Sequence, residues 1–363
     1  MKIMTLLGTR PEIIRLSRII PLLDRYAGRH ILVHTGQNFT SSLSGIFFQE
    51  LGLRQPDYIL QDRQTTLGGQ LAAMFSQMEQ ILEKEQPDRV LLLGDTNSAL
   101  CAILIERMGI PVVHMEAGNR CFDLEVPEEK NRKVIDAISS INMSYTIQSK
   151  HHLIAEGVHS HRIVLTGNPI YEVMQHYEQE ISNSDILERL GLQKGDYFLV
   201  TAHRAENVDR PEHLHEIMGG LNKVAETFGR RLICSIHPRT KSKIADHLRI
   251  EMHPLVEFYK PFGFFDFVKM ERHACCALSD SGTVQEECCI MHVPTVTLRR
   301  TTERPETVDC GSNIVSGVDA NSIVESVAIM SEMRRDWECP EGYLTQGVSE
   351  KVVKFLLGGN WNV

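Results

Sequence analysis

The sequence lacks the long apolar and strongly charged segments that mark several specialised protein classes. No run of about 18 consecutive apolar residues occurs, and the apolar stretch Met1–Leu7 is too short for a signal peptide. No block of five or six like charges is present, and the formal net charge is -9. These absences predict a soluble cytoplasmic protein with neither a membrane nor a nucleic acid as its partner.

Paired cysteines with metal-binding or redox spacing are also missing. The chain has nine cysteines, an odd number, and none of them forms a CxxC motif. In a chain without a secretory signal this usage predicts reduced thiols, with no disulfides and no zinc site. We therefore expect no metal and no cofactor.

What the sequence does contain is an alternation of apolar strands and amphipathic helices, which occurs twice. The 363 residues exceed one ordinary hydrophobic core. Runs of Val, Ile and Leu without polar alternation predict parallel strands covered on both faces. In the first half we expect strands at Lys2–Leu7, His30–His34, Arg89–Leu93 and Pro111–Met115, and helices at Pro11–Tyr26, Leu67–Glu85 and Asn97–Met108. In the second half we expect strands at Tyr197–Thr201, Arg231–Ile236, Ala277–Leu278 and Thr295–Leu298, and helices at Pro211–Phe228, Phe265–His273, Thr283–Met291 and Val348–Leu357.

The predicted fold class is α/β, with two Rossmann-like domains whose parallel sheets face a central cleft. We expect one domain at residues 1–167, completed by the C-terminal helix at 348–363, and the other at residues 168–347. Polar turns follow the predicted strands in both halves, and ligands of such sheets bind at that edge. These turns are Gly8–Glu12, Gly94–Thr96, Glu116–Gly118, Ala202–Glu206, His237–Arg239 and Asp280–Gly282.

Asp280-Ser281-Gly282-Thr283 lies between a predicted strand and a predicted helix. A helix N-terminus attracts anions, and Ser281 and Gly282 allow a phosphate to approach closely. Glu287, within two helical turns, could accept both hydroxyls of a ribose. The simpler alternative is a Ser/Thr helix cap without a ligand.

Several cationic side chains follow predicted strands. Arg10 opens the first helix and could bind a phosphate, or it could form a surface ion pair with Glu12. His203-Arg204 and His237-Pro238-Arg239 repeat the order strand, histidine, arginine. An isolated histidine is more often structural, but the repetition favours phosphate recognition.

Carboxylates gather in the first half, at Asp95, Glu116 and Glu128 among others. Asp95 and Glu116 end predicted buried strands, whereas Glu128 could simply be an acid in the first turn of a helix. Acids in one domain and cations in the other predict proton transfer on a sugar whose diphosphate is bound.

With these residues the sequence resembles the non-hydrolysing UDP-N-acetylglucosamine 2-epimerases, built like glycosyltransferases of the two-Rossmann B architecture (GT-B). The resemblance covers essentially the whole chain. Its motifs are Gly8-Thr9-Arg10-Pro11-Glu12, Gly94-Asp95-Thr96, His114-Met115-Glu116-Ala117-Gly118, Pro127-Glu128-Glu129, Asn131-Arg132, Thr166-Gly167-Asn168, His203-Arg204, His237-Pro238, Asp280-Ser281-Gly282, Gln285-Glu286-Glu287 and Thr301-Thr302-Glu303-Arg304-Pro305-Glu306.

The resemblance implies a C2 epimerisation by elimination and re-addition of UDP, which supplies precursors for surface polysaccharide. It implies a homodimer whose partner is a UDP-linked amino sugar. It also implies that Asp95, Glu116 and Glu128 are the acid–base carboxylates. The implied substrate-binding residues are Arg10, Arg15, His203, Arg204, His237, Ser281, Gly282, Glu287 and Arg304.

Two departures bear on the sugar. Arg15 stands where many members that act on UDP-N-acetylglucosamine carry Lys, and Arg300 stands where the usual run has Asp. The stretch Glu116–Asp123 looks more like a subgroup that forms UDP-N-acetyl-L-fucosamine from the L-talose derivative. The nucleotide and the C2 chemistry are therefore better supported than the sugar.

Three other functions are compatible with the same fold. A glycosyltransferase would share the nucleotide site but needs an acceptor groove. A hydrolysing epimerase would release UDP and N-acetylmannosamine, and water exclusion distinguishes it. A nucleotide-sugar sensor could dispense with the carboxylates that this chain retains.

Overall fold

The structure is a computed structural model, and it describes residues 1–36, 45–61, 64, 66–236, 240, 242–244 and 250–358. The chain divides into two compact units. Met1–Gln175 and Glu341–Val363 form the N-terminal unit, and His176–Pro340 form the C-terminal unit.

A seven-stranded parallel sheet forms the centre of the N-terminal unit, in the order β3-β2-β1-β4-β5-β6-β7. The chain thus builds one half of the sheet, returns to its middle, and builds the other half, as Rossmann folds do. The strands are β1 (Lys2–Leu7), β2 (Arg29–His34), β3 (Tyr58–Ile59), β4 (Arg89–Leu93), β5 (Val112–Met115), β6 (Ile141–Ser144) and β7 (Ile163–Leu165).

Helices connect these strands. They are α1 (Arg10–Leu16), α2 (Ile19–Tyr26), α3 (Ile46–Glu50), α4 (Leu67–Glu85), α5 (Ala102–Arg107), α6 (Pro127–Ile138), α7 (Ile147–Ala155), α8 (Ile170–His176) and α18 (Val348–Leu357), with 3-10 turns η2 (Asn97–Cys101) and η3 (Ser160–Arg162). The predicted bounds of α4 are confirmed. The Thr66 hydroxyl caps its start, and Gln86 ends it in a left-handed conformation.

The single helix predicted over Pro11–Tyr26 is wrong, because the chain forms α1 and α2 with a break at Ser17 and Arg18. The cause is Pro21, which has no N–H to donate to the Ser17 carbonyl and would clash with it inside a continuous helix. In the first turn of α2 the same proline is tolerated. The predicted helix at Asn97–Met108 likewise begins as the 3-10 turn η2 before α5.

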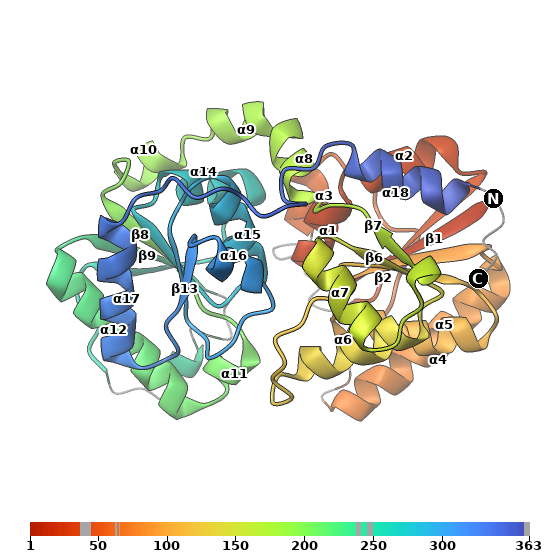
Figure 1. The fold of residues 1–363 in the computed structure, drawn as a ribbon, viewed down its shortest axis with the longest axis horizontal. Helices are drawn as coiled ribbons and strands as arrows, with labels where there is room; N and C mark the ends of the chain where they lie inside the picture. Colours follow the sequence, from red (N-terminus) through yellow and green to blue (C-terminus); the bar gives the residue numbers. More distant parts are fainter. Residues whose placement is uncertain are drawn as a thin grey trace. The chain divides into compact units, whose positions relative to one another are not determined.

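The last helix, α18, belongs to the N-terminal unit although it follows the whole C-terminal unit in the chain. It lies against α2, as Figure 1 shows for the blue and red helices. The guanidinium group of Arg89, at the start of β4, donates to the carbonyl groups of Phe355 and Gly358 near the end of α18.

The C-terminal unit has a six-stranded parallel sheet in the order β10-β9-β8-β11-β12-β13, which is the same winding. Its strands are β8 (Tyr197–Thr201), β9 (Arg231–Ser235), β10 (Val256–Tyr259), β11 (Cys276–Ser279), β12 (Thr295–Thr297) and β13 (Asn313–Val315). Its helices are α9 (Glu178–Asn183), α10 (Ile186–Leu190), α11 (Ala205–Val208), α12 (Pro211–Phe228), α14 (Phe264–His273), α15 (Gly282–Ile290), α16 (Pro305–Asp309) and α17 (Ala320–Glu332).

Strand β8 shows why its sequence is apolar without alternation. Phe198 and Val200 pack on one face of the sheet against α12 and α17, which lie side by side (Figure 1). Tyr197 and Leu199 pack on the other face, in a cluster with side chains of α14 and α15. The predicted α/β class with parallel sheets is confirmed. Among the described residues, no helix is both long and apolar enough to cross a membrane.

Candidate functional site

Four of the six polar turns follow the strands at which the winding of each sheet changes direction. In the N-terminal unit, β1 and β4 are neighbours, so the turns that follow them begin side by side. In the C-terminal unit, β8 and β11 have the same relationship. The crevice at such a point is where ligands of open α/β sheets bind. Each unit therefore has, by itself, the edge at which ligands of such sheets bind.

Glu12 ties together the turns after β1 and β4. Its carboxyl group accepts hydrogen bonds from the N–H groups of Gly8 and Thr9 and, at 2.8 Å, from the Thr96 hydroxyl. Burial raises the pKa of Glu12 to about 7, although these hydrogen bonds act in the opposite direction. Glu12 is 2% exposed, so its carboxyl group does not lie at the surface, where the alternative of an ion pair with Arg10 would place it. Arg10 instead opens α1 with its guanidinium carbon 5.8 Å from the centre of the Phe47 ring.

Arg15 and Glu116 form a buried ion pair, with 2.7 Å between Nη1 and Oε2. Glu116 follows β5 with a φ of 68°, a conformation that few residues other than glycine adopt. Gly118, at φ 85°, lies so close to helix α7 that a Cβ would be 2.1 Å from the Ser149 carbonyl oxygen. The turn that presents Glu116 is thus fixed by backbone conformation at one end and by close packing at the other.

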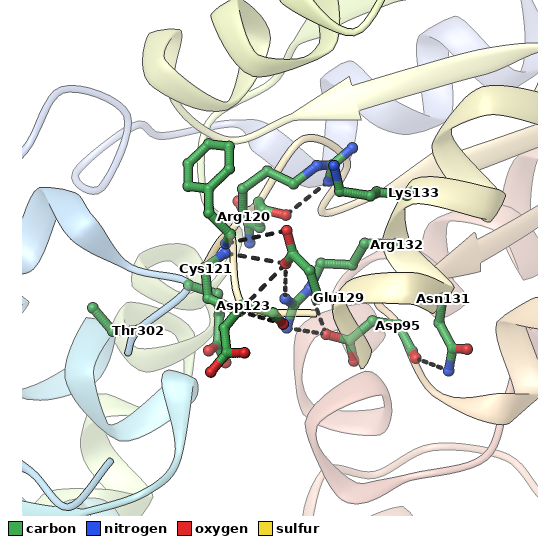
Figure 2. A network of polar contacts seen from close by, with 12 residues as sticks. Asp95, Arg120, Cys121, Asp123, Glu129, Asn131, Arg132, Lys133 and Thr302 are labelled. Carbon is green, nitrogen blue, oxygen red and sulfur yellow. Dashed lines mark hydrogen bonds and ion pairs between the residues drawn. The ribbon is translucent and has the colours of Figure 1, made fainter. Parts of the chain in front are cut away.

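Asp95, in the turn after β4, is bound by helix α6 (Figure 2). Its Oδ2 atom lies 2.6 Å from Nη2 and 2.8 Å from Nε of Arg132, and its carbonyl oxygen accepts from Asn131 at 2.9 Å. Nη1 of Arg132 donates to the buried carboxyl group of Glu129. Arg132 therefore joins two acids, of which Asp95 remains partly accessible to solvent.

Glu129 and Glu128 have different surroundings although they are adjacent. The Glu129 carboxyl group is buried and accepts from the N–H groups of Cys121 and Phe122, so it shapes the loop before α6. Glu128 lies in the first turn of α6, the helix whose Arg132 binds Asp95. Glu128 thus lies one helical turn before Arg132, and Glu116 follows β5, the strand next to β4.

In the C-terminal unit, Asp280 organises the turn after β8. Its Oδ2 atom accepts from the N–H groups of His203 and Arg204, each at 2.9 Å, and from the Asn207 amide at 3.1 Å. Nδ1 of His203 lies 3.4 Å from the other oxygen, and the imidazole is 39% exposed. Asp280 was not among the predicted site residues. Its position in the motif Asp280-Ser281-Gly282, directly before the predicted Ser281, could have identified it.

The predicted cations Arg204 and Arg304 both contact carboxylates. Arg204 lies 2.9 Å from Glu303, which also pairs with the buried Arg299. Arg304 pairs with Glu286 on α15, and both groups are buried. A Cβ at Gly282 would come 2.8 Å from the Glu303 carboxyl oxygen, so a larger residue at this helix start would displace the end of the Glu303 side chain.

Ser281 occupies the N-cap position of α15, and among the described residues its hydroxyl forms no capping bond. The simple cap therefore does not explain this serine. Glu287 lies buried in the second turn of the same helix. His237 lies outside the described residues, as do Pro238 and Arg239.

Neither a metal cluster nor a disulfide defines the site. In the described ranges, no three His, Cys, Asp or Glu side chains form a group that could hold a metal ion. All nine cysteines are free thiols in the structure. Sγ of Cys289 lies 3.8 Å from Sγ of Cys310.

This chain is similar to known proteins over nearly its whole length. The model of the family described as UDP-N-acetylglucosamine 2-epimerase matches residues 23–357. A protein of Methanocaldococcus jannaschii named UDP-N-acetylglucosamine 2-epimerase is 38% identical over 368 residues, covering 99% of this chain and 100% of its own length. A Pseudomonas aeruginosa protein named UDP-2,3-diacetamido-2,3-dideoxy-D-glucuronate 2-epimerase is 35% identical, covering 90% of this chain and 91% of its own.

Solved structures show the same similarity. The crystal structure of the M. jannaschii epimerase, in complex with UDP-GlcNAc and UDP, has a TM-score of 0.94 and covers 99% of this chain and 100% of that one. A glycosyltransferase involved in lipopolysaccharide biosynthesis has a TM-score of 0.62 at 14% identity, covering 99% of this chain and 100% of its own. This second likeness concerns the fold alone, which is of the GT-B type.

Proposed function

Because the chain belongs to the UDP-N-acetylglucosamine 2-epimerase family, we propose that it inverts C2 of a UDP-linked 2-acetamido sugar by eliminating and re-adding UDP. The observation that carries this proposal is the pair of turns after β4 and β5, each of which contains a carboxylate. Asp95 and Glu116 are held there by guanidinium groups from two different helices, α6 and α1. A sensor that only binds the nucleotide sugar could dispense with these two acids, whereas proton transfer at C2 requires them.

The proposed reaction begins with removal of the proton at C2. A carboxylate accepts this proton, the C–H electron pair becomes a C1–C2 double bond, and the C1–O electrons leave with UDP. UDP then attacks C1 again, while a second acid returns a proton to the opposite face of C2. The C2 hydrogen is not acidic by itself, so departure of the stabilised diphosphate must assist its removal. We assign the two proton transfers to the group of three carboxylates Asp95, Glu116 and Glu128, without assigning a face of the sugar to each.

We assign UDP recognition to the turns of the C-terminal unit, together with Arg10 in the N-terminal unit. The start of α15 offers amide groups and a positive dipole end to a phosphate, and Ser281 has a hydroxyl that does not cap this helix. His203 and Arg204 are held by Asp280 in the adjacent turn, and the remaining expected contacts are Gly282, Glu287, Arg304 and His237. Binding requires that the phosphate compete with the ion pairs of Arg204 and Arg304. We also propose that the enzyme acts as a homodimer, needs no cofactor, and supplies a precursor for surface polysaccharide.

For the sugar we propose UDP-N-acetylglucosamine and its manno epimer, as in the name of the 38% identical relative. Arg15 supports a second candidate, the UDP-linked 6-deoxy-L-talosamine derivative that yields N-acetyl-L-fucosamine. The Arg15 guanidinium group is bound to Glu116 itself, so a change from Lys at this position alters the surroundings of a proposed acid–base residue.

The test is NMR spectroscopy of the chain with each UDP sugar in deuterated water. We expect one sugar to reach a mixture of two C2 epimers, with deuterium at C2 and no free sugar. Free N-acetylmannosamine and UDP would identify a hydrolysing enzyme instead. Epimerisation without deuterium at C2 would reject proton abstraction at that carbon.

A further inference from the structure

A buried histidine connects the two turns that carry the proposed acid–base residues. His114 lies on β5, is fully buried, and has acceptors at both ring nitrogens. Its Nε2 atom is 2.8 Å from the carbonyl oxygen of Gly94, and its Nδ1 atom is 2.8 Å from Oδ1 of Asp136 on α6. Gly94 immediately precedes Asp95, so the imidazole binds the peptide group that joins these two residues.

The hydrogen count at His114 is constrained by its partners. A carbonyl oxygen only accepts, so Nε2 must carry a hydrogen. A second proton then lies between Nδ1 and Oδ1 of Asp136, on whichever of the two atoms binds it. Both side chains are buried, and a hydrogen bond in a region of low dielectric constant is stronger than the same bond in water.

The second oxygen of Asp136 acts on the other turn. Oδ2 accepts from the N–H group of Gly118 at 3.1 Å and lies 2.7 Å from Nη2 of Arg120. Arg120 also forms an ion pair with Glu156, which follows α7. Gly118 stands two residues after Glu116, within the same turn. One buried carboxyl group thus fixes the Glu116 turn directly and the Asp95 turn through His114.

We propose that Asp136 and His114 are positioning residues that hold Asp95 and Glu116 in register with each other. The proposal rests on the catalytic roles assigned above. The Glu116 turn needs such support, because Glu116 has a φ of 68°, which is costly for a residue with a Cβ. A misplacement of about 1 Å in a reacting group can cost about a hundredfold in rate.

A purely structural role would not require this arrangement. Buried ionic groups can often be replaced by apolar side chains without loss of stability. Stability alone therefore does not explain why His114 and Asp136 are paired here. A second His–Asp pair joins His30, near the amino end of β2, to Asp24 on α2. That pair contacts Thr5 and Arg54, and Asp24 is 31% exposed where Asp136 is 2% exposed, so it is the control for loss of a His–Asp contact away from the two turns.

The experiment compares Asp136→Ala, Asp136→Asn and His114→Ala with Asp24→Ala. It measures kcat, KM, the Kd for UDP, and amide hydrogen exchange by mass spectrometry over residues 93–98 and 116–120. We expect Asp136→Ala to lower kcat about a hundredfold while KM and Kd change by less than about threefold. Exchange should accelerate in both peptides for Asp136→Ala, but only in residues 93–98 for His114→Ala.

The conservative variant separates positioning from folding. An asparagine at 136 keeps an acceptor for Gly118 and can donate to a neutral His114, so Asp136→Asn should recover about tenfold of the lost kcat. If Asp136→Ala does not fold, amide hydrogen exchange of Asp136→Asn and His114→Ala over residues 93–98 and 116–120 still tests the proposal. Unchanged exchange in both turns, or a kcat loss equal to that of Asp24→Ala, overturns the proposal. Absence of epimerisation by the unmodified chain would reject the proposed function, while the exchange data would still decide whether the two turns are held as described.

Discussion

The guanidinium group of Arg15 and the carboxyl group of Glu116 lie 2.7 Å apart and are 3% and 8% exposed, so helix α1 and the turn after β5 share a buried ion pair. A buried charge is tolerated only with its partner, and its removal leaves the other charge in a medium of low dielectric constant. The pair therefore connects the stability of the N-terminal unit with the position of a proposed acid–base residue.

Arg15→Met is expected to lower the free energy of unfolding by about 3 to 5 kcal/mol, because Glu116 loses its guanidinium partner. Urea denaturation measures this loss. The double variant with Glu116→Gln should recover a large part of it, since the remaining charge is then gone. Lys354→Met is the control, because Lys354 and Glu350 form an exposed pair on α18 worth about 0.5 kcal/mol or less. A loss in Arg15→Met no larger than in this control would contradict the buried pair.

Asp95→Asn is expected to lower kcat by about a thousandfold or more, because the amide cannot accept the C2 proton. The amide oxygen still accepts from Arg132, so the fold of the turn and the Kd for UDP should remain nearly unchanged. NMR of the epimerisation and calorimetric titration with UDP measure the two quantities. Equal losses in both would make Asp95 a binding residue.

How far the sequence predicts the fold depends on the element. Strand β1 and helices α4 and α18 have the predicted bounds, because continuous apolar runs and clear terminal signals define them. The single helix expected over Pro11–Tyr26 is broken although its apolar spacing is regular. Pro21 cannot donate a hydrogen bond to the carbonyl four residues earlier and would clash with it. Local rules of this kind are stronger than periodicity.

Glu12→Gln is expected to change how stability depends on pH. The pKa of Glu12 is raised to about 7 from its usual 4.5, so the folded state favours the protonated form. Its contribution is fully present below pH 4.5 and is lost as the pH rises through 7. The difference between the two values corresponds to about 3 kcal/mol. Thermal unfolding of both proteins from pH 5 to 8 should show a fall in the unmodified chain that is smaller in the variant; parallel curves would contradict it.

Gly282→Ala is expected to weaken UDP binding about tenfold, because the added methyl group meets the Glu303 carboxyl oxygen and disturbs the helix start that we assign to phosphate. Gly219→Ala is the matched control. Gly219 lies inside α12 with no atom closer than 3.9 Å to the new Cβ, so this change should stabilise the chain by about 0.5 to 1 kcal/mol. Calorimetry with UDP and urea unfolding measure the two effects. Unchanged UDP affinity in Gly282→Ala would move the phosphate away from α15.

The candidate site was predictable in part, for a reason that lies in the topology. Side chains just after buried strands, such as Asp95 and Glu116, could be located because parallel strands share one edge. Asp136 could not, since an acid inside the polar sequence of α6 has the same pattern whether it faces water or His114. Its role depends on contacts with residues 18 to 22 positions earlier, which no local pattern records.

The position of α18 has a consequence for the chain while it is being synthesised. Helix α2 leaves the ribosome early, but α18, which packs on it, emerges only after the whole C-terminal unit. During translation the N-terminal unit therefore waits with an uncovered apolar surface while the whole C-terminal unit is made. A nonsense codon shortly before Val348 would leave that surface exposed permanently, and the shortened product would be a client for chaperones and proteases even with every site residue intact.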